Sequence, residues 1–413
     1  MTSSSLINFE VNYPWINSSL FEKLLQKDYN SDDVIEVENY LLEPALKQGE
    51  NFLSQMIRAR VEYRANGSSN KINFVIKAQL LDGAQSVHQN ELFSREIAVF
   101  KYVIPLAEEL LRRIDDDTKF SAKCYEANSE KRYIVFEDLT SRGYRNIDKQ
   151  IGLTVDNFKS AFLVLAKWHA ATAVLVHTGN HPTMRLFDDM FTTTFFETLV
   201  KTIVEKTAQF IKEFKPDHEK LAIKLEVLSD RIFSKIQEAT ERVSTEFNCI
   251  CHSDLWTNNI MFNDSLPLDN NALLIDFQMV HTGSPVLDIC YSLFSSSEVS
   301  AREDVFDSLL SYYHDHLSST LKQLGYKNEI PTLDFLKDQM LLRGIYGVPL
   351  GIWGTIRRYP DETDINEMDL LTSDGEEIKL HWYKLFNNPM CHSKVMFLLK
   401  YFDSKGYFDM KGV

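Results

Sequence analysis

Two short apolar segments that carry or lead into an aspartate constrain this chain more than any other feature. Residues 247–252 lead into Asp254 within the run His-Ser-Asp-Leu-Trp-Thr-Asn-Asn, which ends at Asn259. Residues 273–277 contain Asp276, which is followed by phenylalanine and glutamine. Length and composition predict that both segments are strands, separated by a turn-rich stretch. We therefore expect one aspartate in a loop and the other at a strand end.

These side chains match the requirements of phosphoryl transfer to a hydroxyl. The reaction needs a carboxylate that orients or deprotonates the attacking hydroxyl, and oxygen ligands that hold Mg²⁺ against the phosphates. We predict that Asp254 is the base, and that Asn259 and Asp276 are the metal ligands. The alternative is that these residues form only a helix cap and a turn and have this spacing by chance.

The N-terminal part has a strand pattern of its own. Residues 52–63 alternate with period two, and every second position from Ile57 on is apolar. Asn66-Gly67 predicts a hairpin turn before a return strand over 72–79. A helix over 90–103 is expected next, ended by Pro105.

This part also supplies the lysine and the glutamate that a kinase-type site needs. Lys77 lies in the return strand, where it would bind the α- and β-phosphates of the nucleotide. Glu91 and Glu96 compete as its partner on the following helix. At about 100° per residue, Glu96 borders the apolar stripe that would pack on the sheet, whereas Glu91 points almost oppositely. We predict the pair Lys77–Glu96.

After residue 140 the pattern changes to long helices. Apolar residues recur with helical spacing over 158–176, 195–214 and 220–242, and the chain after Pro285 is mainly helical. A small β-rich part followed by a larger helical part predicts an α+β fold with two lobes.

The charge balance bears on possible partners. The chain has 44 Lys and Arg against 59 Asp and Glu, a formal net charge of −15. Binding to nucleic acid or to anionic membranes needs a basic face, so we expect no nucleic-acid partner and no membrane partner. The apolar stretch 161–176 is interrupted by Lys167 and is shorter than the roughly 20 residues that a bilayer needs. We predict a buried core helix there.

Cysteine usage favours a reducing compartment. Five cysteines are too few and too scattered for a disulfide framework, and no secretory signal is apparent, so we expect a cytoplasmic protein. Cys249 and Cys251 are expected on opposite faces of a strand, which argues against a zinc site. His169 is expected to be a packed, hydrogen-bonded histidine. His252 is also expected to be structural, because a base role would duplicate Asp254.

The whole pattern resembles the choline-kinase-like branch of the protein-kinase-like fold. It is most similar to the insect ecdysteroid-kinase-like family, whose members are also called juvenile-hormone-inducible proteins. The segments that carry the resemblance are Gly49-Glu50-Asn51-Phe52-Leu53-Ser54, Phe93-x-x-Glu96-x-x-x-Phe100, Phe136-Glu137-Asp138-Leu139, Leu165-Ala166-Lys167-Trp168-His169-Ala170, His252-Ser253-Asp254-Leu255-Trp256-x-Asn258-Asn259, Ile275-Asp276-Phe277-Gln278 and Pro285-x-x-Asp288-Ile289.

The resemblance implies an antiparallel-sheet N-lobe over residues 1–139, with a hinge at 137–139, and a mostly helical C-lobe over 140–413. It implies ATP and Mg²⁺ as cofactors. The nucleotide would be bound by a loop that covers its phosphates, by Lys77 and Glu96, and by the backbone of the hinge. The loop residues are Gly49, Glu50, Asn51 and Ser54, and the hinge residues are Glu137 and Leu139. Asp288 would brace the catalytic loop over 252–259, and His169 would support it.

Three departures from protein kinases narrow the class of acceptor. The nucleotide loop lacks Gly-x-Gly-x-x-Gly, Asp276-Phe277 is followed by Gln278 instead of glycine, and no Ala-Pro-Glu segment follows. We therefore expect a kinase that phosphorylates a hydroxyl of a small molecule and not a protein. We also expect the protein to be a monomer. The resemblance implies an ecdysteroid-like steroid or a xenobiotic. Choline, ethanolamine or an aminoglycoside is the alternative acceptor, and a non-catalytic nucleotide-binding protein is the alternative from another class.

The acceptor pocket is expected in the helical region. Residues 342–359 include Tyr346, Trp353 and the glycines Gly347, Gly351 and Gly354. This composition predicts an apolar, open-backboned wall suited to a flat hydrophobic ligand. The acidic run over 361–369 could bind an amine-rich acceptor instead, although loop acids are usually solvated.

Overall fold

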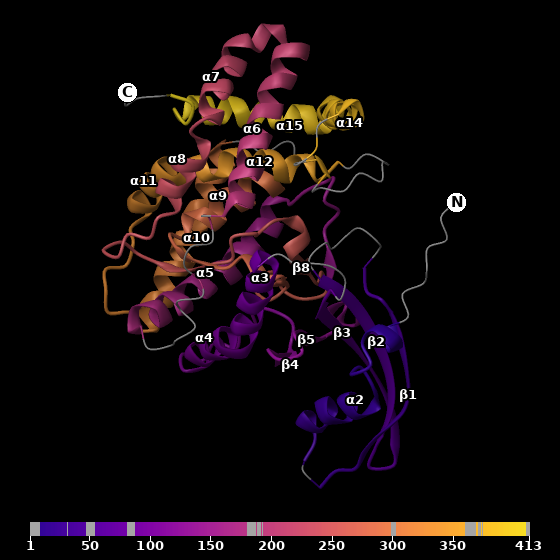
Figure 1. The fold of residues 1–413 in the computed structure, drawn as a ribbon. Coiled ribbons are helices and arrows are strands. Elements are labelled where there is room, and N and C mark those ends of the chain that lie inside the picture. Colours follow the sequence, from indigo (N-terminus) through magenta and orange to yellow (C-terminus); the bar gives the residue numbers. More distant parts are fainter. Residues whose placement is uncertain are drawn as a thin grey trace. The chain divides into compact units, whose positions relative to one another are not determined.

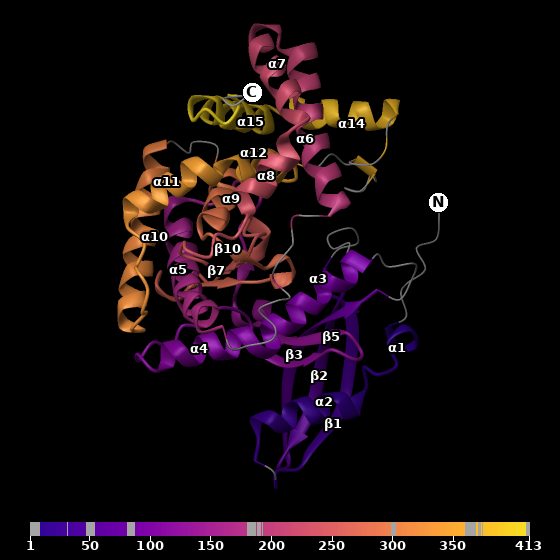
Figure 2. The same cartoon turned by 60° about the vertical axis from the view of Figure 1, so that its left-hand side comes forward.

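The computed structural model describes residues 9–30, 32–46, 54–80, 87–179, 187, 191, 193–298, 303–359, 369–370, 373 and 375–409. The chain divides into two compact units (Figures 1 and 2). The N-terminal unit is Met1–Pro105 with Ser121–Tyr144, and the C-terminal unit is Leu106–Phe120 with Arg145–Val413.

The predicted boundary after residue 139 therefore needs correction. Leu106–Phe120, expected in the N-lobe, belongs to the C-terminal unit. The reason is packing: the Phe120 ring lies edge-on to Trp168, with centroids 5.3 Å apart. Asp116 also forms an ion pair with Lys167 at 2.7 Å.

The N-terminal unit is built on a five-stranded antiparallel sheet in the order β1-β2-β3-β5-β4. Asn66 and Gly67 both have positive φ angles, 49° and 81°, as a two-residue hairpin turn requires. The predicted hairpin is confirmed. The strands are β1(Ile35–Pro44), β2(Ser54–Ala65), β3(Ser68–Gln79), β4(Cys124–Asn128) and β5(Tyr133–Glu137).

The apolar face of this sheet is the one that the period-two pattern predicted. Ile57, Ala59, Val61 and Tyr63 are all buried, in one core with α2(Ser18–Leu25) and the short α1(Phe9–Asn12). The helix α3(Val87–Ala98) lies on the opposite face of the sheet. Just after this helix, Phe100 packs on Phe136 of β5.

The prediction that Pro105 ends this helix is wrong. A π-helical segment over Val99–Val103 follows α3, and the chain continues as α4(Ile104–Arg112). The Ile104 N–H bonds to the Val99 carbonyl, five residues back. Because the hydrogen-bond register has shifted, Pro105 lies in the first turn of α4, where its missing N–H costs nothing.

The C-terminal unit is mostly helical. The predicted helix over 220–242 is two helices, with a break at Asp230 and Arg231. The helices are α5(Val155–Thr178), α6(Thr194–Phe214), α7(Glu219–Ser229), α8(Ile232–Thr240), α9(Val286–Ser296), α10(Glu303–Gln323), α11(Leu333–Arg343), α12(Gly347–Ile356), α14(Glu376–Asn387) and α15(Pro389–Ser404). The short strands are β6(Arg145–Asn146), β7(Cys249–Cys251), β8(Ile260–Phe262), β9(Ala272–Leu274) and β10(His281–Gly283).

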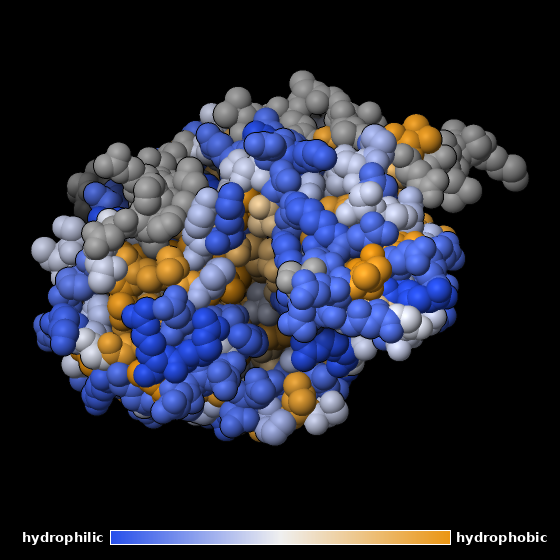
Figure 3. Space-filling view, turned by 90° about the horizontal axis from the view of Figure 1, so that it is seen from below, coloured by the Kyte–Doolittle hydropathy of each residue, from blue (hydrophilic) through white to orange (hydrophobic). Residues whose placement is uncertain are grey.

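Helix α5 is the core of this unit. Among the described residues it is the one helix long and apolar enough to cross a membrane, yet 67% of its most apolar window is buried inside the protein. It packs along α10 and against β7 (Figure 2), and the Trp168 indole donates to the Ile250 carbonyl at 2.6 Å. The predicted core helix is confirmed. On the face seen in Figure 3, hydrophilic side chains prevail and hydrophobic ones form smaller groups.

The glycines of α12 have a different role from the predicted one. A Cβ atom at Gly347 or Gly351 would lie 2.4 or 2.6 Å from Phe294 of α9, and one at Gly354 would lie 2.4 Å from Ser295. The interpretation of α12 as an open-backboned pocket wall is therefore wrong. The glycines let α12 pack closely on α9 (Figure 1).

Gly351→Ala should lower the free energy of unfolding by about 1–3 kcal/mol, because the new methyl overpacks the contact with Phe294. Chemical denaturation measures this change. Gly375→Ala is the matched control, since no atom lies within 4 Å of its new Cβ. Equal stability of the two variants would contradict the close helix contact.

Candidate active site

The predicted partner of the strand lysine is confirmed. Lys77 of β3 and Glu96 of α3 form an ion pair at 2.5 Å, with side chains only 3% and 1% exposed. Glu91, the competing residue, is exposed. Two buried charges persist only when they are paired, so this pair fixes the lysine ammonium group in place.

The other predicted nucleotide residues of this unit have mixed outcomes. Gly49, Glu50 and Asn51 lie outside the described residues, and Ser54 is buried at the start of β2. At the predicted hinge, the Glu137 N–H donates to the Lys123 carbonyl at 2.9 Å, and the Leu139 carbonyl accepts from the Tyr144 N–H at 3.0 Å. The prediction that the hinge backbone binds adenine thus rests on two other groups, the Glu137 carbonyl and the Leu139 N–H.

The catalytic loop starts directly after β7 in the C-terminal unit. Asp254 accepts a hydrogen bond from the Tyr291 hydroxyl at 2.9 Å and another from the Asn259 amide nitrogen, also at 2.9 Å. The Asn259 amide also donates to the Asp254 carbonyl, at 2.8 Å. Since the amide nitrogen of Asn259 is used within the loop, its amide oxygen is the atom left for a metal ion.

Helix α9 holds this loop at several points. The Asp288 carboxylate accepts from the backbone N–H groups of His252 and Ser253, at 2.6 and 2.7 Å. The Ser296 hydroxyl accepts from the Thr257 N–H at 3.0 Å. Asp288 therefore braces the loop, as the resemblance implied, and Ser253 is held at a positive φ of 63° that a serine seldom adopts.

Asp276 lies where the strand β9 has just ended. The Ile275 N–H donates to the Asn259 carbonyl at 3.0 Å, and the His252 ring bonds to the Ile275 carbonyl at 2.9 Å. Asp276 has a left-handed backbone, with φ 66°. The structure thus brings Asp254, Asn259 and Asp276 into one hydrogen-bonded frame. The amide oxygen of Asn259 and the carboxylate oxygens of Asp276 are ligands of the kind that Mg²⁺ prefers.

The electrostatics of the loop suit a base. Burial is the largest effect on Asp254 and raises its pKa. The positive charge of Arg357 lowers this pKa, and the negative charge of Asp276 raises it. The hydrogen bonds from Tyr291 and Asn259 also lower it, and the resulting pKa is about 7. A carboxylate with this pKa can accept a proton near neutral pH.

The two histidines have the structural roles that were predicted. His169 is buried and bonds through Nδ1 to the Tyr313 hydroxyl at 2.7 Å and through Nε2 to Asp288 at 3.0 Å. Burial lowers the pKa of His252, whose ring nitrogen Nε2 bonds to a backbone carbonyl.

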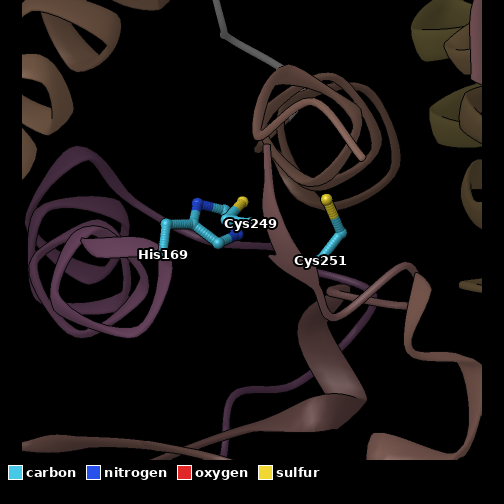
Figure 4. A group of neighbouring side chains, drawn as sticks. All are labelled: His169, Cys249 and Cys251. Carbon is cyan, nitrogen blue, oxygen red and sulfur yellow. The ribbon is translucent and has the colours of Figure 1, made fainter. Parts of the chain in front are cut away.

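The prediction that Cys249 and Cys251 lie on opposite faces of a strand is wrong. Figure 4 shows both cysteines beside His169, and their sulfur atoms and a ring nitrogen lie within 4.8 Å of one another. Side chains two positions apart on a strand share a face, so the two thiols had to point the same way. Because both ring nitrogens of His169 already hold hydrogen bonds, we assign the cluster to the brace behind the catalytic loop and not to a metal.

The predicted pocket residues do not line open space. Tyr346 is fully buried, and its hydroxyl donates to the Ser253 carbonyl at 3.3 Å. Trp353 is buried beside Trp382, with ring centroids 6.0 Å apart. Tyr346, the residue just before α12, therefore supports the catalytic loop.

Two residues of the site were missed in the sequence. Tyr291 lies one helical turn after Asp288, so the helix period could have placed it on the same face. Arg357 comes about 100 residues after the loop that it contacts, where its guanidinium lies 4.3 Å from the centre of the Trp256 ring. No local pattern predicts such a contact.

The family of the chain follows from a match that spans this machinery. The model of the ecdysteroid kinase-like family matches residues 48–326. This chain belongs to the ecdysteroid kinase-like family. The matched range includes Lys77, Asp254 and Asp276. By its family the protein is a small-molecule phosphotransferase with a protein-kinase-like fold.

Other similarities are more distant. A choline kinase from Cryptosporidium parvum is 14% identical, with a TM-score of 0.45 over 92% of this chain and 93% of that one. An ethanolamine kinase from Plasmodium vivax is also 14% identical, with a TM-score of 0.42 over 88% of this chain and 83% of that one. A Caenorhabditis elegans protein named uncharacterized oxidoreductase dhs-27 is 26% identical over 111 residues, which are 26% of this chain and 14% of that protein.

The raised pKa of Asp254 predicts a pH-dependent cost to stability. Because the folded pKa of about 7 exceeds the ordinary value of 3.8, the folded state keeps a proton that the unfolded state loses, and stability falls as pH rises between these values. Asp254→Asn should therefore raise the melting temperature most above pH 7. Calorimetry at pH 5 and pH 8 measures this gain.

The exposed Asp264 supplies the control for this prediction. Asp264→Asn should change stability little at either pH, because a surface ion pair contributes little. If Asp254→Asn were no more stable than the natural protein at pH 8, burial of the Asp254 charge would not be costly.

Proposed function

We propose that this protein transfers the γ-phosphoryl group of MgATP to a hydroxyl group of a small organic molecule. The observation that carries the proposal is the constrained catalytic loop, in which Asp254 is held by Tyr291 and Asn259. A carboxylate held at both oxygens by hydrogen-bond donors is suited to orient one hydroxyl.

Each residue has a chemical role in this proposal. The acceptor hydroxyl gives its proton to Asp254 as its oxygen bonds to the γ-phosphorus, and the bond from that phosphorus to ADP breaks. Lys77, fixed by Glu96, neutralises the phosphates that are not transferred. Asn259 and Asp276 would hold Mg²⁺, which neutralises charge on the β- and γ-phosphates.

For the acceptor we propose a bulky, largely apolar alcohol, such as an ecdysteroid-like steroid or a xenobiotic. The family description supports this class. Choline, ethanolamine and aminoglycosides are the competing acceptors. We also propose that the protein acts as a monomer in the cytoplasm, and its five free cysteines support a reducing compartment.

Binding of the nucleotide can be tested without knowing the acceptor. At roughly 100 times its dissociation constant, MgATP should stabilise the protein by about 2.7 kcal/mol, which a thermal shift detects. Asp276→Asn and Lys77→Met should lose most of this shift, whereas Lys71→Met, at an exposed lysine of the same strand, should keep it. A shift that needs no Mg²⁺ and survives Asp276→Asn would contradict the proposed metal ligand.

Turnover tests the catalytic role and the acceptor together. Incubation with MgATP and a panel of steroid alcohols, choline, ethanolamine and an aminoglycoside, followed by mass spectrometry, should give a phosphorylated steroid. Asp254→Asn should slow that reaction by roughly 10²–10⁴-fold without loss of the MgATP thermal shift. Strong turnover of choline or the aminoglycoside alone would overturn the proposed acceptor, and nucleotide binding with no turnover of any alcohol would favour the non-catalytic alternative.

A further inference from the structure

The positively charged side chain of Arg357 lies against the catalytic loop but is not part of it. Arg357 follows the last residue of α12, and its guanidinium lies 4.3 Å from the centre of the Trp256 ring. Trp256 comes two residues after Asp254 and is itself buried. An arginine over the face of a tryptophan is attracted by the electrons of the ring, so Arg357 has a preferred position beside the loop.

The helix that carries Arg357 is itself rigidly placed. Its glycines pack on Phe294 and Ser295 of α9, the helix that also supplies Asp288 and Tyr291 to the loop. At the other end of α12, the Tyr346 hydroxyl bonds to the Ser253 carbonyl. Asp254 and Arg357 are thus positioned by the same two packed helices.

The charge of Arg357 acts where negative charge gathers. Its guanidinium lies on the ring of Trp256, two residues after Asp254, so the cation lies against the same loop as the proposed base. In phosphoryl transfer, negative charge is spread over the three oxygens of the group in flight, and a fixed cation stabilises that state more than the ground state.

We propose that Arg357 is a catalytic cation that contacts the phosphoryl group during its transfer to the acceptor hydroxyl. This inference rests on the proposed kinase function and adds a residue to it. The bond from the acceptor oxygen to phosphorus forms, the bond from phosphorus to ADP breaks, and the hydroxyl proton goes to Asp254. Arg357 keeps its protons throughout.

The test uses an analogue of the transferring group, so it needs no known acceptor. MgADP with aluminium fluoride should bind the natural protein more tightly than MgADP alone, as calorimetry or a thermal shift measures. Arg357→Met should weaken binding of the fluoride complex by roughly 10²-fold and leave the affinity for MgADP within about twofold. Arg357→Lys should recover part of the loss, because it keeps the charge without the planar group.

Controls separate this role from a general loss of positive charge. Arg113→Met removes an exposed arginine and should change neither affinity. With an identified acceptor, Arg357→Met should lower kcat and leave the KM for ATP nearly unchanged.

The outcomes distinguish this inference from the function on which it rests. Equal binding of the fluoride complex by the natural protein and Arg357→Met would overturn the role of Arg357 and leave the kinase proposal standing. Binding of MgADP with no gain from aluminium fluoride in the natural protein would also overturn it. No binding of MgADP by the natural protein would overturn both.

Discussion

The buried carboxylate of Asp288 accepts hydrogen bonds from two successive backbone N–H groups, those of His252 and Ser253, and a third bond from His169. This contact stabilises a strained turn, because Ser253 has a left-handed backbone. Without an acceptor here, two buried N–H groups would be left unsatisfied, and each would cost about 1–3 kcal/mol. The position of Asp254, the next residue, depends directly on this turn.

Helix α9 extends the same constraint to the rest of the site. One turn after Asp288, Tyr291 fixes one oxygen of Asp254, and near the end of the helix Ser296 holds the Thr257 N–H. Between them, Phe294 packs against the glycines of α12, the helix that ends beside Arg357. The base and the neighbouring cation are therefore placed by one helix contact, and the residues that build it are as important as those that do chemistry.

Local rules predicted the parts of this protein that depend on local periodicity. The hairpin, the buried face of β2 and the choice of Glu96 over Glu91 all follow from periods of two or 3.6 residues. The motif around Asp254 and Asp276 could be read because its residues lie close together in the sequence. Cys249 and Cys251 were misplaced only because the strand period was applied wrongly.

The remaining errors concern packing between distant segments. Neither the π-helical segment that accommodates Pro105 nor the glycine contact of α12 with α9 has a local signature, because each depends on what the helix packs against. The contact of Arg357 with the loop and the burial of Tyr346 were missed for the same reason.

Amide hydrogen exchange in Asp288→Asn tests the central claim, that the Asp288 carboxylate holds the catalytic loop. The His252 and Ser253 amides should exchange roughly tenfold faster or more, with the β2–β3 hairpin unchanged; unchanged exchange at both amides would contradict the account.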